Sequence, residues 1–336
     1  MKYLGLTLDG SWGFEQHFAA LAPKVGRIAE ALSRLLPNIG GPGVKTRRLY
    51  ANTVLSVALY GSPVWAGEMA ASARIQASMH RALQLAAIRV IRSYRTVSYT
   101  ASTVLAGIPP VEFLAEQYRE AYNGLRDLRR EGSFPPSAVD RMRRQARARA
   151  ICSWEQFLGR VARVEYLSGR RVATAIHPRL RQWLGRRGRG LSFRTTQVLT
   201  GHGCFGEYLH NIGRERTTKC HHCAAGRDTA QHTLEVCPAW DAERRVLLAV
   251  VGCDLSLPTL VERMLEGEEN WRAVSTFCEN VISQKEEAER IRRGEANPPD
   301  DPHADGAGVP RRRRLVGRRR RPPAHLRGGR FPPHPP

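Results

Sequence analysis

The stretch FEQHFAALAPKVGRIAEALSRLL, residues 14–36, sets the fold class, because its apolar residues return every three or four positions. This spacing predicts an amphipathic helix with one apolar stripe that packs against a core. The residues of the stripe are Phe14, Phe18, Leu21, Val25, Ile28, Leu32 and Leu35. Pro37 and the run NIGGPG that follows it end the predicted helix.

The segments around this helix extend the same pattern. Before it, KYLGLTLDGSWGF (residues 2–14) predicts a strand or hairpin that turns at Asp9-Gly10. After it, helical spacing predicts further helices over 47–66, 68–92, 99–107, 111–130 and 241–293. We therefore expect a mainly α fold with a short N-terminal β segment.

The charge of the chain indicates an anionic partner. The net charge is +22 over 336 residues, which favours nucleic acid over a membrane surface. Residues 119–194 hold 19 arginines, no lysine and six acidic residues, on segments that keep helical spacing. A solvated helix face and compositional drift toward arginine are the alternatives, but the local concentration of charge favours phosphate contacts.

The run KCHHCAAGRDTAQHTLEVCP, residues 219–238, is the densest group of soft metal ligands. Cys220, Cys223, His232 and Cys237 follow the pattern C-x2-C-x8-H-x4-C, which predicts one tetrahedral zinc ion. Four protein ligands leave no open coordination position, so we expect a structural site rather than a hydrolytic one. His221 and His222 lie inside the C-x2-C turn, where side chains point away from the metal.

Other cysteines and histidines are assigned differently. His202, Cys204 and His210 lie upstream and form at most a second half-site, which we do not favour. Cys278 has helical spacing with Trp271, Val274, Phe277 and Ile282, so we expect it in a core. An odd number of cysteines, seven, indicates reduced thiols rather than a disulfide framework.

Basic and aromatic residues stand beside the cluster. Small zinc knuckles bind nucleic acid through a basic strip for phosphates and aromatic rings for bases. Four basic residues are therefore predicted to contact nucleic acid: Arg194, Arg214, Arg216 and Lys219. Phe193, Phe205, Tyr208 and Trp240 are nearby rings, although a core position is the favoured interpretation of Phe205 and of Tyr208 when each is taken alone.

The last segment differs from the rest. Ten of the 21 prolines and two runs of four arginines, 311–314 and 318–321, lie in it. Such a composition cannot bury a core and predicts disorder, with the arginine runs serving nuclear import or nucleic-acid contact. A read-through or mis-predicted end of the gene is the alternative. No apolar run long enough for a membrane span and no secretory signal are present.

Three stretches together resemble one known family. KYLGLTLDGSWGFEQHF, RRLYANTVLSVALYGSPVW and the string from TGHG through CPAW to AERRVLLAVVG are similar to the C-terminal part of non-LTR (LINE-type) retrotransposon polyproteins. The similarity is strongest to the arthropod type that inserts into ribosomal DNA, and it covers roughly residues 1–290. It implies that Tyr3, Leu4 and Gly5 belong to a primer-grip region and that the next helices form a thumb. It also implies that the cysteine–histidine cluster is a zinc knuckle that engages RNA or target DNA.

The departures from that family concern catalysis. A polymerase that uses two metal ions needs clustered acidic residues, including an adjacent Asp pair. The only such pair, Asp300-Asp301, lies in the proline-rich segment. We therefore expect no catalytic residue and no endonuclease in this chain. The Mg²⁺ ions, the fingers and the catalytic palm would belong to an upstream part of the polyprotein. The chain would be inactive alone and would bind RNA and/or DNA. We expect it in the nucleus after cytoplasmic transit, and we expect neither a membrane partner nor a small-molecule substrate.

These expectations divide the chain into six segments. They are the end of a palm (1–13), a thumb-like helical domain (14–131), an Arg-rich helical connector (132–194), a CCHC zinc-knuckle region (195–240), C-terminal helices (241–293) and a disordered tail (294–336). The competing hypothesis is a host nuclear protein whose zinc module mediates protein or nucleic-acid contacts.

Overall fold

The computed structural model describes residues 1–10, 12–132, 135–186 and 188–295. The described chain is mainly helical, with one two-stranded sheet, so the predicted fold class is confirmed. Among the described residues no helix is both long and apolar enough to cross a membrane. The tail predicted over 294–336 lies outside the described residues from position 296 onward.

The N-terminal strands form a hairpin whose turn is not the predicted one. β1 (Lys2–Tyr3) and β2 (Leu6–Thr7) pair antiparallel, with Tyr3 opposite Leu6. Leu4 and Gly5 make the turn with φ values of 44° and 83°, a region that glycine occupies without strain. The turn prediction at Asp9-Gly10 was wrong: Asp9 lies past the hairpin and accepts a hydrogen bond from Gly13 N at 2.9 Å.

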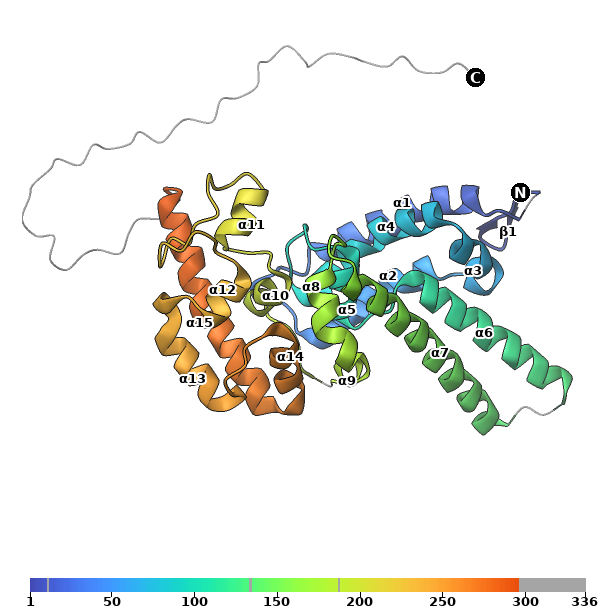
Figure 1. Cartoon of the computed structure of the whole chain (residues 1–336). Helices are drawn as coiled ribbons and strands as arrows, with labels where there is room; N and C mark the ends of the chain where they lie inside the picture. The colour runs from blue at the N-terminus through green and yellow to red at the C-terminus, as the bar shows by residue number, and fades with distance from the viewer. Residues whose placement is uncertain (11, 133–134, 187, 296–336) are drawn as a thin grey trace, which may run out of the picture.

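A helical bundle follows the hairpin and forms the first part of the core (Figure 1). Within it α1 packs along α4, and α2 and α5 also contact α4. Phe18, Val25, Trp65 and Met79 are almost completely buried between these helices. The helices are α1 (Glu15–Ser33), α2 (Val44–Ala58), α3 (Ser62–Ala71), α4 (Ala73–Ile91) and α5 (Tyr99–Ala106).

Two of the predicted helix boundaries in this bundle were wrong. The chain breaks at Gly61, which has φ of 70°, so the segment predicted as one helix over 47–66 is divided between α2 and α3. It breaks again at Ser72, whose hydroxyl accepts a hydrogen bond from Ile75 N and caps α4. Periodicity across both breaks stays helical, which is why the spacing alone did not reveal them.

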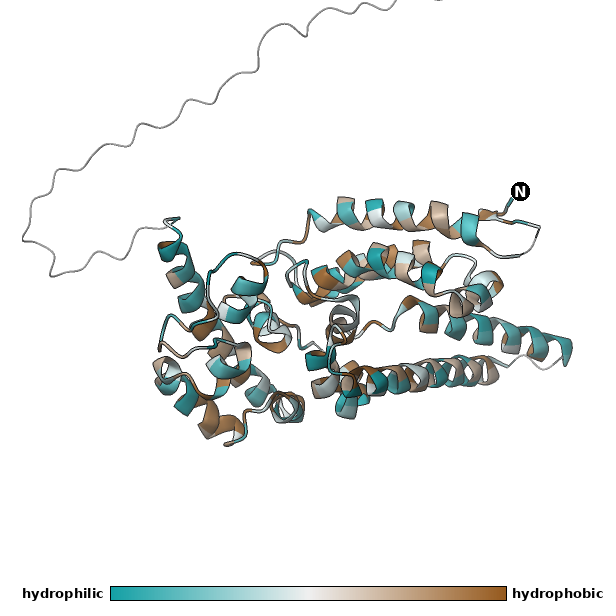
Figure 2. Ribbon diagram, turned by 45° about the horizontal axis from the view of Figure 1, so that its top comes forward, coloured by the Kyte–Doolittle hydropathy of each residue, from teal (hydrophilic) through white to brown (hydrophobic). Residues whose placement is uncertain are grey.

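The next two helices form a long antiparallel hairpin that extends from the bundle (Figure 1). They are α6 (Val111–Arg130) and α7 (Pro136–Arg163). Ala146, Trp154, Leu158 and Val161 line the buried side of α7, and arginines occupy much of its exposed side. Figure 2 shows the resulting mixture of hydrophilic and hydrophobic residues along these helices.

Short helices connect this hairpin to a C-terminal group built on the long helix α15 (Glu268–Arg292). α10, α13 and α14 contact α15. Trp271, Val274, Phe277 and Cys278 of α15 are buried, which places Cys278 in the core. The remaining helices are α8 (Arg170–Ile176), α9 (Leu180–Gly185), α10 (Phe193–Thr200), α11 (Gly206–Asn211), α12 (Ala230–Glu235), α13 (Asp241–Val251) and α14 (Leu257–Glu266), with 3-10 turns η1 (His177–Arg179) and η2 (Pro238–Trp240).

Candidate metal centre

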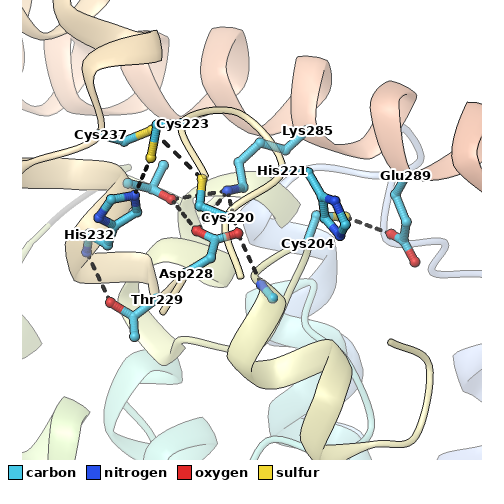
Figure 3. A network of polar contacts seen from close by, with 12 residues as sticks. Cys204, Cys220, His221, Cys223, Asp228, Thr229, His232, Cys237, Lys285 and Glu289 are labelled. Carbon is cyan, nitrogen blue, oxygen red and sulfur yellow. Dashed lines mark hydrogen bonds and ion pairs between the residues drawn. The ribbon is translucent and has the colours of Figure 1, made fainter. Parts of the chain in front are cut away.

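Four side chains from one loop, one short helix and the turn after that helix converge beside α15 (Figure 3). The Sγ atoms of Cys220, Cys223 and Cys237 and one ring nitrogen of His232 all lie within 4.8 Å of one another. Cys220 Sγ is 3.9 Å from Cys237 Sγ, and Cys223 Sγ is 3.3 Å from His232 Nε2. Tetrahedral zinc with bonds of about 2.0–2.3 Å sets its ligand atoms about 3.5–3.8 Å apart, so the separations fit such an ion.

The local backbone explains why the four side chains meet. Cys220 N donates to Ala225 O at 2.8 Å and Ala224 N donates to Cys220 O at 2.9 Å, which closes a tight turn around the C-x2-C pair. Ala224 has φ of 59°, a value that L-residues rarely adopt and that allows this reversal. Thr229 caps α12 by accepting a hydrogen bond from His232 N, and Cys237 N donates to His232 O at 2.8 Å.

The burial of the cluster is uneven. Cys220 and Cys237 are buried, while Cys223 and His232 are partly exposed. Burial raises the pKa of the Cys220 and Cys237 thiols and lowers the pKa of His232. Neutral imidazole is the form that binds a metal, and a bound divalent cation stabilises thiolates at otherwise unfavourable buried positions. The donor set therefore fits a thiophilic divalent ion such as zinc.

A buried ion pair ties the cluster to α15. Lys285 Nζ lies 3.0 and 2.9 Å from the two carboxylate oxygens of Asp228 and 3.2 Å from Thr233 Oγ1. Asp228 also accepts a hydrogen bond from Gly206 N at 3.0 Å, and its own amide donates to Thr218 O at 2.7 Å. Asp228 thus joins α11 and α15 through its carboxylate, and it holds the segment before Cys220 through its backbone amide.

A second support lies at the other end of α12. Arg244 of α13 is buried and donates to the carbonyl oxygens of Thr233, Leu234 and Cys237. The Thr233 and Leu234 carbonyls belong to the last turn of α12, where carbonyl groups lack partners within the helix, and Cys237 follows just after it. Arg244 therefore fixes the C-terminal end of α12 and the turn that leads from it to Cys237.

Sequence reasoning missed these supporting residues. Lys285 was recognisable in principle, because it continues the apolar spacing of Cys278 and Ile282 and so points into the core. Asp228 carried no such signal, because it lies in an irregular loop between the ligand pairs.

The neighbouring histidines lie outside the four-ligand cluster. His221 is 3.5 Å from a carboxylate oxygen of Glu215, and the ring of His222 lies 4.9 Å from the ring of Trp240. Cys204 donates to Glu289 at 3.0 Å, and His202 contacts Thr96. Within the described ranges, Cys220, Cys223, His232 and Cys237 form the only metal-binding group of three or more such ligands.

The predicted nucleic-acid contacts differ in their surroundings. Arg214, Arg216 and Lys219 are exposed on the segment that leads into Cys220. Arg194 instead lies against α15, where it donates to Glu286 at 2.9 Å and to Glu279 at 2.7 Å. Three of the four predicted residues are thus exposed on one segment, while the guanidinium of Arg194 is occupied by two carboxylates.

The residues proposed for a primer-grip region lie at the opposite end of the molecule from the cluster (Figure 1). Tyr3 and Leu4 are 59% and 72% exposed at the tip of the hairpin, and Gly5 packs on Tyr60. The Tyr60 hydroxyl donates to Leu4 O at 3.0 Å, which fixes the hairpin on the start of α3.

Fold and site together define a mainly helical protein with a Cys3His cluster able to hold a metal ion. The 115 kDa protein of type-1 retrotransposable element R1DM of Drosophila melanogaster is 29% identical over 84% of this chain and 28% of its own length. Pol polyproteins of R1 elements from Nasonia vitripennis and Bradysia coprophila are each 25% identical, over 86% and 72% of this chain and 73% and 24% of their own lengths. The chain is thus a homologue of the polyproteins of R1-type non-LTR retrotransposons, as its motifs indicated.

The alignments cover only part of these relatives. The chain spans less than a third of the length of the Drosophila and Bradysia relatives. No protein-family model matches the chain, and no solved structure matches it.

Proposed function

We propose that this chain is a nucleic-acid-holding region of an R1-type reverse transcriptase polyprotein, organised by a structural zinc ion. The observation that carries the proposal is the convergence of Cys220, Cys223, His232 and Cys237 in a chain homologous to R1 polyproteins. Four protein ligands complete a tetrahedral zinc site, so the ion would support the fold and take no part in chemistry.

The charge distribution supports a nucleic-acid partner. Arg214, Arg216 and Lys219 stand exposed directly before the cluster, where phosphates can reach them. The net charge of +22 supplies a sequence-independent attraction to RNA or DNA that falls steeply with salt. We assign the helical region 14–131 a thumb-like role in holding template and primer, and we place the protein in the nucleus, where target DNA is found.

The competing hypothesis of a host nuclear zinc-module protein is supported less well. Its zinc module would have the same geometry, but the relatives that align with 72% to 86% of the chain are proteins of R1 elements. We propose binding alone for the chain, because a two-metal polymerase needs clustered acidic residues, whereas the adjacent Asp pair of this chain, Asp300-Asp301, stands in a proline-rich segment.

The zinc content of the protein tests the proposed structural site. Purified protein should hold about one zinc ion per chain by native mass spectrometry, and Cys223→Ser or His232→Ala should remove it and destabilise the module. Cys253→Ser is the matched control, because Cys253 is exposed and outside the cluster, and it should retain the ion. Retention of zinc by the Cys223 variant, or absence of zinc from the wild type, would contradict a structural site.

A further inference from the structure

A groove of about 1100 Å³ lies at the side of the molecule opposite the metal cluster. Its walls come from α2, from the start of α3 and from the α6–α7 hairpin, which lie next to one another in Figure 1. Its volume exceeds the range of about 300–1,000 Å³ that is typical of small-molecule sites. Two features of its lining identify what it can hold.

The first feature is a set of arginines without partners. Arg143, Arg144 and Arg147 of α7 and Arg48 of α2 line the groove, and none of them forms an ion pair with a described residue. No acidic side chain belongs to the described lining. Glu116 and Glu120 of α6 lie next in sequence to lining residues of the groove. Glu116 pairs with Arg119 and Glu120 pairs with Arg149, and none of these residues lines the groove.

Such an arrangement leaves four positive charges facing one space. Like charges brought together without counter-charges destabilise the fold slightly unless an anion lies between them. Arg143 and Arg147 are four residues apart on α7, so their side chains lie on the same face, about one helical turn from each other. A chain of phosphates can contact both arginines at once.

The second feature is a row of exposed tyrosines. Tyr118 and Tyr122 of α6 are 47% and 55% exposed, and Tyr60, which also lines the groove, is 58% exposed. Tyr118 and Tyr122 are also four residues apart, so their Cβ atoms lie about 6 Å apart on the same face of the helix. Tyr60 is held in place by its hydrogen bond to Leu4 O.

Exposed rings beside unpaired arginines are the surface that single strands require. Unpaired bases stack on aromatic faces while the backbone follows a positive groove. A duplex keeps its base faces stacked inside and cannot use the tyrosines. A small anion would use the arginines alone and would leave the row of rings without a function.

We propose that the groove between α2, α6 and α7 binds single-stranded nucleic acid, with Arg143 and Arg147 on the phosphates and Tyr118 and Tyr122 under the bases. This assignment rests on the proposed nucleic-acid function and adds a location and a strand type to it. It also places a binding surface away from the zinc module, so the two surfaces can hold different segments of nucleic acid.

The test uses the full chain with three labelled probes of one sequence: single-stranded RNA, single-stranded DNA and a DNA duplex. Tyr118→Leu/Tyr122→Leu should weaken binding of a single strand by at least about fivefold and leave duplex binding unchanged. Tyr118→Phe/Tyr122→Phe keeps both rings and should bind like the wild type. The RNA and DNA arms show whether the 2′-hydroxyl contributes.

Charge is tested with a matched pair of variants. Arg143→Gln/Arg147→Gln should lower the slope of log affinity against log salt by about 1.4, which corresponds to two phosphate contacts on a single strand. Arg27→Gln/Arg34→Gln removes the same charge from exposed arginines of α1 and its C-terminal end, outside the groove, and should change the slope much less.

The outcomes separate this inference from the proposed function. Wild-type binding that the groove variants leave unchanged would overturn the groove and leave the nucleic-acid function intact. Equal loss of duplex and single-strand binding in the tyrosine variant would overturn the single-strand assignment. A wild type that binds none of the three probes would overturn the proposed function itself.

Discussion

Gly206 lies where α11 begins against the segment that carries the chain into Cys220. A Cβ atom at this position would lie 2.6 Å from Lys219 O and 2.8 Å from Thr218 O. Both are backbone atoms, and the Thr218 carbonyl is also held by Asp228 N. Neither atom can rotate away, so a glycine is needed here for the close approach rather than for a left-handed backbone.

We therefore predict that Gly206→Ala displaces the Cys220 segment and weakens the metal site. The loss in unfolding free energy should be about 1–3 kcal/mol, the usual cost of overpacking. Urea unfolding and zinc competition with a chelator measure both effects. Gly226→Ala is the control, because a Cβ there meets nothing within 4 Å. Equal unfolding free energies and zinc affinities of the two variants would show that the segment before Cys220 can shift without loss of stability.

The same site shows what residue-level reasoning can reach. The pattern C-x2-C-x8-H-x4-C identified four side chains that the structure brings within 4.8 Å, because ligand spacing reflects local turns. Gly206 and Asp228 were not identified, since their roles depend on contacts between segments far apart in the chain. Local spacing predicts a site, but its support comes from tertiary packing.

At the scale of elements, α15 is the platform on which the cluster region rests. Lys285 has 2% of its side chain exposed and Asp228 has 4%, so their ion pair is shielded from water. The Lys285 ammonium also lies 5.4 Å from the centre of the Phe205 ring, which adds a cation–π contact. Removing one partner of such a pair leaves an uncompensated charge in the interior.

We predict that Lys285→Met lowers the unfolding free energy by about 3–5 kcal/mol. The matched control is Arg227→Met, which removes an arginine that is 71% exposed and paired with Glu207. Exposed pairs are screened by water, so this control should cost much less. Urea denaturation of both variants at constant zinc gives the comparison. Similar losses in the two would mean that Lys285 does not hold the cluster region to α15.

Elements were easier to predict than their ends. The apolar spacing of residues 14–36 predicted a helix that became α1, although Leu35 lies beyond it and is 71% exposed. Gly61 and Ser72 interrupted segments whose spacing stayed helical on both sides. A break changes the backbone direction without changing the order of apolar and polar residues, so periodicity does not register it.

At the scale of the whole molecule, helical content was predictable and helix pairing was not. Each helix carries its own amphipathic pattern, but the partner of its apolar face is chosen by long-range contacts. The groove illustrates this point, because Arg48, Tyr118 and Arg147 meet only after α2, α6 and α7 are arranged around it. Arginine enrichment over 119–194 predicted phosphate contact. That Tyr118 and Tyr122 line the same groove as these arginines became visible only in three dimensions.

The C-terminal residues carry a large share of the positive charge of the chain. Residues 296–336 contain ten arginines and three aspartates, so their removal lowers the net charge from +22 to +15. If these arginines contact phosphates, the full chain should show a steeper salt dependence than residues 1–295, by about 0.7 in log–log slope for each contact on a single strand.

Affinity for one labelled strand, measured at several salt concentrations, gives both slopes. A full-length variant with Gln at 311–314 and 318–321 keeps the length and removes eight of the charges. It should behave like the shortened chain, since counterion release depends on charge and not on length. Equal slopes for all three proteins would confine the phosphate contacts to residues 1–295, where the groove arginines and the basic strip before Cys220 are the groups available to make them.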